Sequence, residues 1–295
     1  MINQVIVKIF KFAKYQFMKV AKRKVDLVVI SDVHLGTYGC HAKELNKYLA
    51  SISPKTLVLN GDIVDIWQFS KSYFPKSHIK VIKKILSFAA TGTKVYYVTG
   101  NHDEMLRKFS DAFVGNFAIL DKIVLEFDGK KAWIFHGDVF DSSVTHAKWI
   151  AKLGGYGYDY LILMNRFVNW LLQKIGRPPY SFSKKIKSSV KGAVKHISNF
   201  ETTAAELAIE NGYDYVICGH IHEPQIKTVK NHFGSTTYLN FGDWIENLTT
   251  LEYLKNKWQV YRYAHDLKLK NQADKIEIEK SLTNAELIQN IVTPQ

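Results

Sequence analysis

The segment Ser31-Asp32-Val33-His34 directly follows the apolar, β-branched run Val25–Ile30. Such a run predicts a buried strand, so Asp32 and His34 lie at its carboxyl end. Side chains two residues apart in an extended backbone point the same way, so these two side chains are able to bind one cation. Taken alone, however, an Asp-x-His pair is more typical of a surface turn, and the interpretation depends on the rest of the chain.

Four further polar clusters also follow predicted strands. Ligands of open α/β sheets bind outside the carboxyl ends of the strands, and glycines occur where the chain must turn beside a ligand. Five such coincidences favour one shared metal site over five separate turns. The four clusters and their strands are Asn60-Gly61-Asp62 after Thr56–Leu59, Gly100-Asn101-His102-Asp103 after Lys94–Thr99, His136-Gly137-Asp138 after Lys131–Phe135, and Gly219-His220-Ile221-His222 after Tyr213–Cys218.

Between the clusters, short β-rich runs alternate with helical stretches. Helical spacing predicts helices over residues 41–51, 77–90 and 200–211, the last ending at Asn211-Gly212. Strand–helix–strand crossovers in the first half imply parallel pairing, whereas closely spaced strands with short turns fill the second half. The sequence therefore predicts an α/β sandwich of two mixed β-sheets flanked by helices. The remaining predicted strands are Ile123–Phe127, Gln225–Val229, Thr236–Asn240, Thr249–Leu254 and Lys257–Tyr263.

The stretch between His136 and Gly219 departs from this alternation because nearly all of it has a helical pattern. Tyr158–Ile175 is apolar around most of its circumference, and a second apolar helical repeat follows Pro178-Pro179. We interpret residues 145–199 as a helical cap inserted over the active site of a domain spanning residues 25–265, with 266–295 as a C-terminal tail. The alternative is a helical hairpin packed on the domain. A separate lysine stripe of the second helix comprises Lys184, Lys187, Lys191 and Lys195.

The formal net charge of +13 is concentrated in two stretches. Residues 1–24 carry seven Lys or Arg and no acid, and residues 160–200 carry eight and no acid, whereas the rest is nearly balanced. Basic stretches of this kind indicate an anionic partner, which is a membrane surface, a nucleic acid or a phosphorylated ligand. Residues 1–24 also have helical apolar spacing, which predicts a basic amphipathic segment on an anionic membrane. The alternative is that this segment packs against the domain or cap.

The cysteine count and the lengths of the apolar runs argue against disulfide-stabilised, membrane-spanning and secreted proteins. Two cysteines, Cys40 and Cys218, provide no disulfide framework and favour a reducing compartment. No apolar run reaches the ~20 residues of a membrane-spanning helix, so we do not expect the chain to cross a bilayer. Residues 1–24 lack the uninterrupted apolar core of a secretory signal.

The candidate ligands indicate the chemistry. Two Asp, one Asn and four His without a thiolate suit borderline divalent ions such as Mn²⁺, Fe²⁺ or Zn²⁺. Seven side chains are too many for one ion but suit two ions that share a carboxylate. Two-metal sites activate a water and stabilise the oxygens of an in-line phosphoryl displacement, so the set predicts a phosphoester hydrolase. The set comprises Asp32, His34, Asp62, Asn101, His136, His220 and His222.

As an ordered series, these blocks resemble the five motifs of the calcineurin-like metallophosphoesterases. The ligand set predicts two divalent metal ions, Mn²⁺ first and Fe²⁺ or Zn²⁺ as alternatives. The resemblance implies a first ion bound by Asp32, His34 and His222. It implies a second ion bound by Asn101, His136 and His220, with Asp62 bridging. It further implies that His102 stabilises the transition state or protonates the leaving group, oriented by Asp103.

Within this superfamily, the chain is similar to the UDP-2,3-diacylglucosamine diphosphatases of lipid A synthesis. This resemblance implies cleavage of a UDP-activated diacyl sugar into UMP and a lipid monophosphate, by a cytoplasmic protein held peripherally on the inner face of the cytoplasmic membrane. The chain departs from the best-known members at His102, where they have an Arg that would also contact substrate phosphate. The similar segments are Ser31–Gly36, His136–Asp138, the helical insertion, Gly219–Pro224 and Asn240–Glu246.

Further roles and rival functions complete these expectations. Asp141 and the lysine stripe are candidates for contacting a phosphorylated lipid or sugar nucleotide. Asp65 and Asp138 are candidates for supporting the metal-ligand side chains. A phosphodiesterase or nuclease using the basic cap is disfavoured by the apolar face of Tyr158–Ile175, so nucleic acid is not the expected partner. A non-catalytic scaffold is disfavoured because every ligand position is filled, and the oligomeric state stays open. Solvated or helix-surface positions are expected for His41, His78, His146, His196, His232 and His265.

Overall fold

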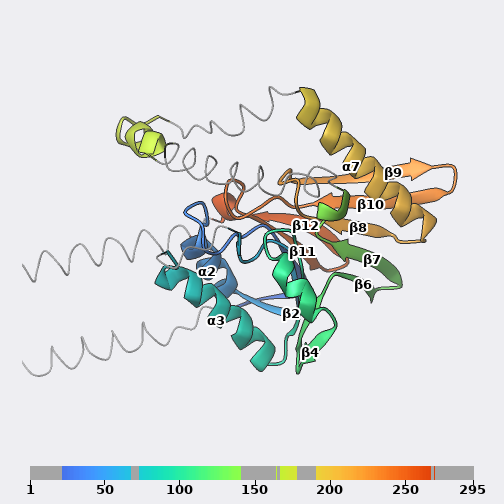
Figure 1. Ribbon diagram of the computed structural model, residues 1–295, viewed down its shortest axis with the longest axis horizontal. Helices are drawn as coiled ribbons and strands as arrows, with labels where there is room; N and C mark the ends of the chain where they lie inside the picture. The colour runs from blue at the N-terminus through green and yellow to red at the C-terminus, as the bar shows by residue number, and fades with distance from the viewer. Residues whose placement is uncertain are drawn as a thin grey trace, which may run out of the picture.

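The computed structural model describes residues 22–67, 73–140, 164, 167–177, 191–266 and 269, the side chains of 191–199 excepted. Two β-sheets pack face to face, with helices on their outer faces (Figure 1). This arrangement confirms the predicted α/β sandwich of two mixed sheets. Within the described ranges, no helix combines the length and apolar character needed to cross a membrane.

The seven-stranded sheet has the order β12-β11-β1-β2-β3-β5-β4. Its central strands pair in parallel through α2 (Ala42–Ser51) and α3 (Lys76–Ala90), as the predicted crossovers require. Antiparallel strands lie at both edges. The two strands that the sequence did not predict, β4 and β5, are only three and four residues long. The strands are β1 (Arg23–Ile30), β2 (Ile52–Asn60), β3 (Lys94–Val98), β4 (Ala112–Val114), β5 (Phe117–Leu120), β11 (Thr249–Leu254) and β12 (Lys257–Arg262).

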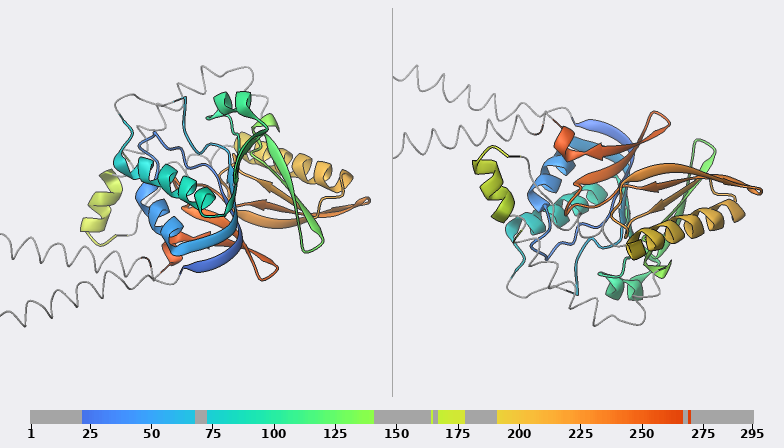
Figure 2. Two further views of the ribbon diagram at one scale, coloured as in Figure 1. Left: turned by 90° about the horizontal axis from the view of Figure 1, so that it is seen from below. Right: turned by 90° about the horizontal axis from the view of Figure 1, so that it is seen from above.

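The five-stranded sheet has the order β6-β7-β8-β10-β9. β7, β8 and β10 are parallel, and β6 and β9 pair antiparallel at the edges. Helix α7 (Lys191–Glu210) covers its outer face, while α2 and α3 cover that of the other sheet (Figure 2). The strands are β6 (Lys122–Phe127), β7 (Lys130–Phe135), β8 (Tyr215–Cys218), β9 (Gln225–Asn231) and β10 (Gly234–Asn240).

Strand β1 shows why the layers stay together. Leu27 and Val29 pack between the two sheets, whereas Val28 and Ile30 pack beneath α2 and α3. Both faces of the strand are therefore buried, which explains its continuous apolar sequence. Each fully buried aliphatic side chain contributes about 1.5–3 kcal/mol, so this strand is a firm support for the residues that follow it.

The predicted helix 200–211 ends as expected but begins too late. Helix α7 starts at Lys191 and runs without a break to Glu210, so it crosses the predicted end of the cap at residue 199. Phe200, Ala204 and Ala208 anchor it on the five-stranded sheet. Within the predicted Tyr158–Ile175 helix, residues 167–174 are helical. Residues 1–21, most of 145–190, and 270–295 lie outside the described ranges.

Candidate active site

All seven predicted ligands lie just beyond strand ends of the two sheets. Asp32 and His34 follow β1, Asp62 follows β2, and Asn101 follows β3. His136 follows β7, and the pair His220 and His222 follows β8. Each of the three carboxamide or carboxylate side chains thus comes from the seven-stranded sheet, whereas the five-stranded sheet provides imidazoles only.

The backbone of this edge adopts an unusual conformation. Five of the seven residues are non-glycine residues in the left-handed region, with φ between 51° and 63°. Such conformations cost about 1–3 kcal/mol each and persist where surrounding structure holds them. Here the His34 N–H donates to Asp62 O at 2.9 Å, and the Asp32 N–H donates to Gly61 O at 3.1 Å. The five residues are Asp32, His34, Asp62, His220 and His222.

Two glycines allow neighbouring loops to approach the carboxylates. A Cβ at Gly219 would lie 2.7 Å from Asp32 Oδ2, and one at Gly100 would overlap Asp62 Oδ1. Any larger residue at either position would displace a ligand. These glycines therefore serve the close approach that the sequence analysis expected at the turns.

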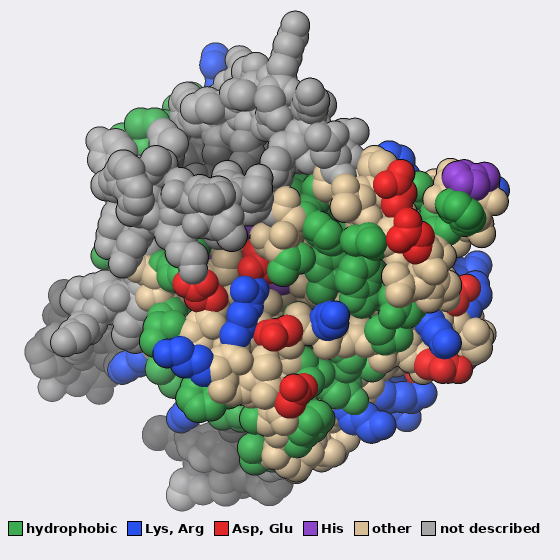
Figure 3. Space-filling model, turned by 45° about the vertical axis from the view of Figure 1, so that its right-hand side comes forward, with side chains coloured by type: hydrophobic (Ala, Val, Ile, Leu, Met, Phe, Trp, Pro, Cys, Tyr) green, Lys and Arg blue, Asp and Glu red, His purple; other side chains and the backbone are tan. Residues whose placement is uncertain are grey.

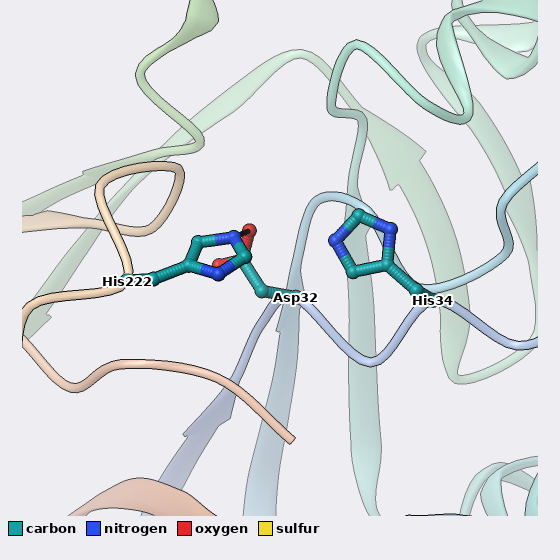
Figure 4. Close-up of side chains that lie close together, drawn as sticks. All are labelled: Asp32, His34 and His222. Atoms are coloured by element: carbon teal, nitrogen blue, oxygen red, sulfur yellow. Dashed lines mark ion pairs between the residues drawn. The ribbon is translucent and has the colours of Figure 1, made fainter. Parts of the chain in front are cut away.

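The first ligand group consists of Asp32, His34 and His222. Their ligand atoms lie within 4.8 Å of one another, and His222 Nε2 is 3.0 Å from Asp32 Oδ1. Figure 4 shows the Asp32 carboxylate at the His222 ring and the His34 ring farther away, with the two rings on separate loops. The arrangement matches the set implied for the first ion.

The second ligand group consists of Asp62, His136 and His220, again within 4.8 Å of one another. Asp62 Oδ2 is 3.2 Å from His136 Nε2 and 3.9 Å from His34 Nε2. The Asp62 carboxylate thus lies between His136 of this group and His34 of the first group.

The residues fit a metal centre. His34 Nε2 and Asn101 Oδ1 are buried and have no hydrogen-bond partner in the described part of the chain. A buried polar atom without a partner costs about 1–3 kcal/mol, which a bound cation would remove. Carboxylate, amide and imidazole donors without thiolate suit borderline divalent ions.

The electrostatics of the site favour positive charge. Burial raises the pKa of Asp32, but the nearby His222 outweighs it and lowers that pKa to about 2. Burial lowers the pKa of His34 and His136, yet carboxylates reverse the effect. Asp65 and Asp62 raise the pKa of His34 to about 9, and Asp62 raises that of His136 to about 10. The same carboxylates would stabilise a divalent cation.

Acceptors behind the rings set the direction of the ligand nitrogens. His136 Nδ1 is 3.0 Å from Asn60 O, and His222 Nδ1 is 3.4 Å from Asp243 Oδ2. Such outer contacts fix the orientation of the ring, so that Nε2 would be the nitrogen that holds a metal ion. The sequence analysis did not assign Asp243 this role; its only signal was its place in the Asn240–Glu246 segment.

Asp65, a predicted support for the ligands, also contacts His102, which the sequence analysis did not expect. Its Oδ2 lies 3.1 Å from His34 Nδ1 and 2.8 Å from His102 Nδ1. Burial raises the pKa of Asp65, but His102 and His34 lower it below the ordinary value. One carboxylate therefore orients both a candidate ligand and the candidate acid.

The predicted partner of His102 is wrong. Asp103 is fully buried, and its carboxylate accepts hydrogen bonds from Tyr97 Oη at 2.6 Å and from the Gly100 and Ile63 N–H groups at 2.6 and 2.9 Å. Burial and the charge of Asp62 raise the pKa of Asp103. Asp103 therefore holds the loop, and Asp65 replaces it as the residue that orients His102.

The remaining predicted residues divide into two sets. His232 and His265 are exposed as expected, but His78 is buried and accepts a hydrogen bond from the Gly36 N–H at 3.0 Å, which corrects its predicted surface position. Helical spacing alone did not show that this side of α3 faces the loop after His34. Residues outside the description, or with side chains outside it, are Asp141, His146, Lys184, Lys187, Lys191, Lys195 and His196.

A protein-family model described as calcineurin-like phosphoesterase matches residues 25–224, which include every candidate ligand. The chain belongs to the calcineurin-like phosphoesterase family. Phosphoester hydrolysis is therefore its reaction class.

Individual proteins similar to this chain have a more specific name than the family. The chain is 24% identical over 245 residues to the UDP-2,3-diacylglucosamine hydrolase of Aliivibrio fischeri (strain MJ11), covering 80% of this chain and 98% of that protein. It is 25% identical over 217 residues to the enzyme of that name from Vibrio cholerae (strain El Tor Inaba N16961), covering 70% and 84%. Among solved structures, a phosphoesterase from E. coli gives a TM-score of 0.42 at 14% identity, covering 80% and 92%.

Proposed function

We propose that the chain is a two-metal hydrolase that cleaves the pyrophosphate bond of a UDP-linked diacyl sugar, giving UMP and a lipid monophosphate. The position of Asp62 carries this proposal, because its carboxylate lies between His136 and His34, one from each ligand group. The proposed first ion would be held by Asp32, His34 and His222. The second would be held by Asn101, His136 and His220 with Asp62 shared. The relatives named UDP-2,3-diacylglucosamine hydrolase support the substrate class.

The residues around the ions would divide the chemistry among them. When bound, two divalent ions polarise phosphoryl oxygens and lower the pKa of the attacking water. His102 Nε2 lies 4.0 Å from Asp62 Oδ2, so it faces the reacting centre and would donate a proton to the leaving oxygen. Asp65 at His102 Nδ1 would stabilise the imidazolium and keep Nε2 directed at the substrate.

Exposed apolar side chains support a substrate with acyl chains. Phe167 and Trp170 on the helical stretch 167–174, and Ile175 directly after it, are 60%, 51% and 66% exposed. Phe109 and Val139, which follow the ligand-bearing loops, are 59% and 70% exposed. Figure 3 shows hydrophobic side chains gathered on one face of the molecule with charged side chains around them. A water-soluble nucleotide alone gives no reason for such exposure.

An anionic membrane surface is the proposed partner, with the protein on the cytoplasmic side. Helix α3 exposes Lys76, Lys80 and Lys83 and contains no acidic residue. Ile79 lies among these lysines and is 43% exposed. Basic and apolar side chains on one helix face suit anionic headgroups, each basic residue contributing ~1 kcal/mol near the surface. The basic residues 1–24 add sequence support.

A product assay tests the substrate. The protein loaded with Mn²⁺ is incubated with UDP-2,3-diacylglucosamine, with UDP-N-acetylglucosamine, with bis(p-nitrophenyl) phosphate and with single-stranded DNA. We expect UMP and lipid monophosphate from the first substrate at a higher kcat/KM than any product from the others. Hydrolysis of the chromogenic diester or of DNA without cleavage of the lipid nucleotide would favour the phosphodiesterase or nuclease alternative.

Paired substitutions test the lipid contact. Phe167→Ala with Trp170→Ala should raise KM for the lipid nucleotide far more than for bis(p-nitrophenyl) phosphate, because only the former has acyl chains. Phe233→Ala is the matched control, since this side chain is 72% exposed in the turn between β9 and β10. Equal effects on both substrates would contradict an acyl-binding role for residues 167–175.

A vesicle assay tests the membrane partner. Deleting residues 2–22, or replacing Lys76, Lys80 and Lys83 by Gln, should reduce co-sedimentation with anionic vesicles at low salt, and high salt should reduce that of the unmodified chain. Full co-sedimentation of a protein that carries both changes would exclude these basic elements as the membrane contact.

A further inference from the structure

We propose that Arg107 is a positioning residue for the second ion group, because its guanidinium joins the loop that carries Asn101 to the turn that follows His136. This inference rests on the proposed two-metal function. It concerns how two ligands from different sheets are kept at a fixed separation.

The guanidinium of Arg107 contacts both sheets. Arg107 lies in the 3₁₀ helix η1 (Glu104–Phe109), which follows the Asn101 loop. Its Nη2 donates to Asp138 Oδ2 at 2.5 Å, and its Nε donates to Thr99 Oγ1 at 3.3 Å. Asp138 begins the 3₁₀ helix η2 (Asp138–Phe140), two residues after His136. One planar group therefore spans from the end of β3 to the turn after β7.

On the seven-stranded sheet, this contact is anchored by a small polar network. Thr99 Oγ1 donates to Asp121 Oδ1 at 2.8 Å, and Ser110 Oγ donates to the same oxygen at 2.8 Å. The Thr99 N–H also donates to Leu120 O at 2.9 Å. Residues at both ends of the loop that carries Asn101 are thus tied to the end of β5, so Arg107 extends from a fixed base.

On the five-stranded sheet, the turn after His136 is confined from its other side. Gly137 has a φ of 120°, and a Cβ there would lie 2.6 Å from Phe200 Cζ. Phe140 packs edge-on against Phe200, with ring centroids 5.7 Å apart. The turn is therefore held between the Phe200 ring and Arg107, with the Asp138 side chain only 8% exposed.

Another side-chain hydrogen bond between the two sheets serves a different ligand. Asn60 also joins the sheets, since its Nδ2 donates to Phe135 O at 3.1 Å, but it belongs to β2 and steadies the Asp62 side. Loss of the Arg107 contact should therefore loosen Asn101 relative to His136 and leave Asp32, His34 and His222 in place. Arginine suits this task because its fork carries two separated donors, which lysine does not.

Metal binding measures the effect without recourse to turnover. The unmodified chain, Arg107→Gln, Arg107→Lys and Asp138→Asn are dialysed to equilibrium against a series of Mn²⁺ concentrations, and bound Mn²⁺ is counted. We expect two ions per unmodified chain. We expect one of the two to bind about 10–100-fold more weakly in Arg107→Gln and Asp138→Asn, with a smaller loss in Arg107→Lys. The double variant should lose no more than either single one, because the two residues act through one contact.

A second arginine provides the matched control. Arg23 donates to both carboxylate oxygens of the buried Glu252, at 2.6 and 2.7 Å, at the opposite end of β1 from the ligands. Arg23→Gln should lower the thermal midpoint while leaving the affinity for both ions unchanged. If Arg107→Gln fails to fold, the nearly isosteric Asp138→Asn decides the question.

The outcomes separate the two proposals. Two ions bound with unchanged affinity in both Arg107→Gln and Asp138→Asn would overturn the role of Arg107 and leave the two-metal function standing. An equal weakening of both ions, matched by Arg23→Gln, would also overturn it, since this indicates general destabilisation. Fewer than two ions in the unmodified chain would overturn both proposals.

Discussion

The two sheets contribute different chemistry to one site. The seven-stranded sheet provides Asp32, Asp62 and Asn101 together with His34, whereas the five-stranded sheet provides only the imidazoles of His136, His220 and His222. Negative charge thus comes from one sheet and most of the nitrogen donors from the other. Neither set alone offers both ligand groups, so the centre exists only where the two edges meet. Substitutions on the two sheets should therefore have distinguishable effects on metal binding and turnover.

The largest effect should follow Asp62→Asn on the seven-stranded side. This change removes the charge that lies between the two ligand groups, so we expect loss of both ions and no measurable turnover. Counting bound Mn²⁺ beside activity checks the expectation. Two ions still bound by the variant would show that Asp62 does not bridge.

The next effect should follow His102→Gln, which removes the proposed acid but no ligand. Turnover should fall by about 10²–10⁴-fold with both ions retained. The loss should be smaller for a substrate with a good leaving group such as p-nitrophenolate, which needs little protonation. Loss of an ion from this variant would place His102 among the ligands instead.

A third comparison separates the two buried aspartates near His102. Asp65→Asn should reduce metal affinity or turnover by about 10–100-fold, because Asp65 orients both His34 and His102. Asp103→Asn should mainly lower the thermal midpoint, since its carboxylate accepts hydrogen bonds from Tyr97 and from backbone N–H groups. Metal titration and thermal unfolding of both variants check this, and the reverse pattern would restore Asp103 as the orienting residue.

The sequence predicted what depends on local pattern. Strands ending in polar residues, the crossovers, and the seven ligands all follow from periodicity and motif order, and the structure brings these residues together. The sequence did not predict β4 and β5, because runs of three or four residues show no clear periodicity. The family resemblance implied that Asp103 orients His102, whereas the fold brings Asp65 to the His102 ring.

The predictions of where α7 begins and of whether His78 is buried were wrong for a similar reason. The start of α7 and the burial of His78 depend on which elements pack together, and no single helix pattern contains that information. Local spacing identified the apolar face of each helix. Which polar side chains are also buried depends on the loops that pack against the helix.

The smallest effect concerns the support beneath the loop that follows His34. Burial lowers the pKa of His78 to about 4, and its Nδ1 accepts the Gly36 N–H, so the folded protein holds this ring neutral. The unfolded chain binds a proton near pH 6.5, so the stabilising contribution is complete above that pH and is lost as the pH falls toward 4. His78→Asn keeps an acceptor near the Nδ1 position but does not titrate. We therefore expect the free energy of unfolding of the unmodified chain to fall relative to the variant by on the order of 2 kcal/mol between pH 7 and 4. Urea unfolding of both proteins with a chelator present measures this difference, because ionisations shared by the two proteins cancel. If the difference in free energy of unfolding between the two proteins stays constant across this pH range, His78 is protonated in the folded protein at low pH. In that case His78 is not a neutral acceptor for the Gly36 N–H there.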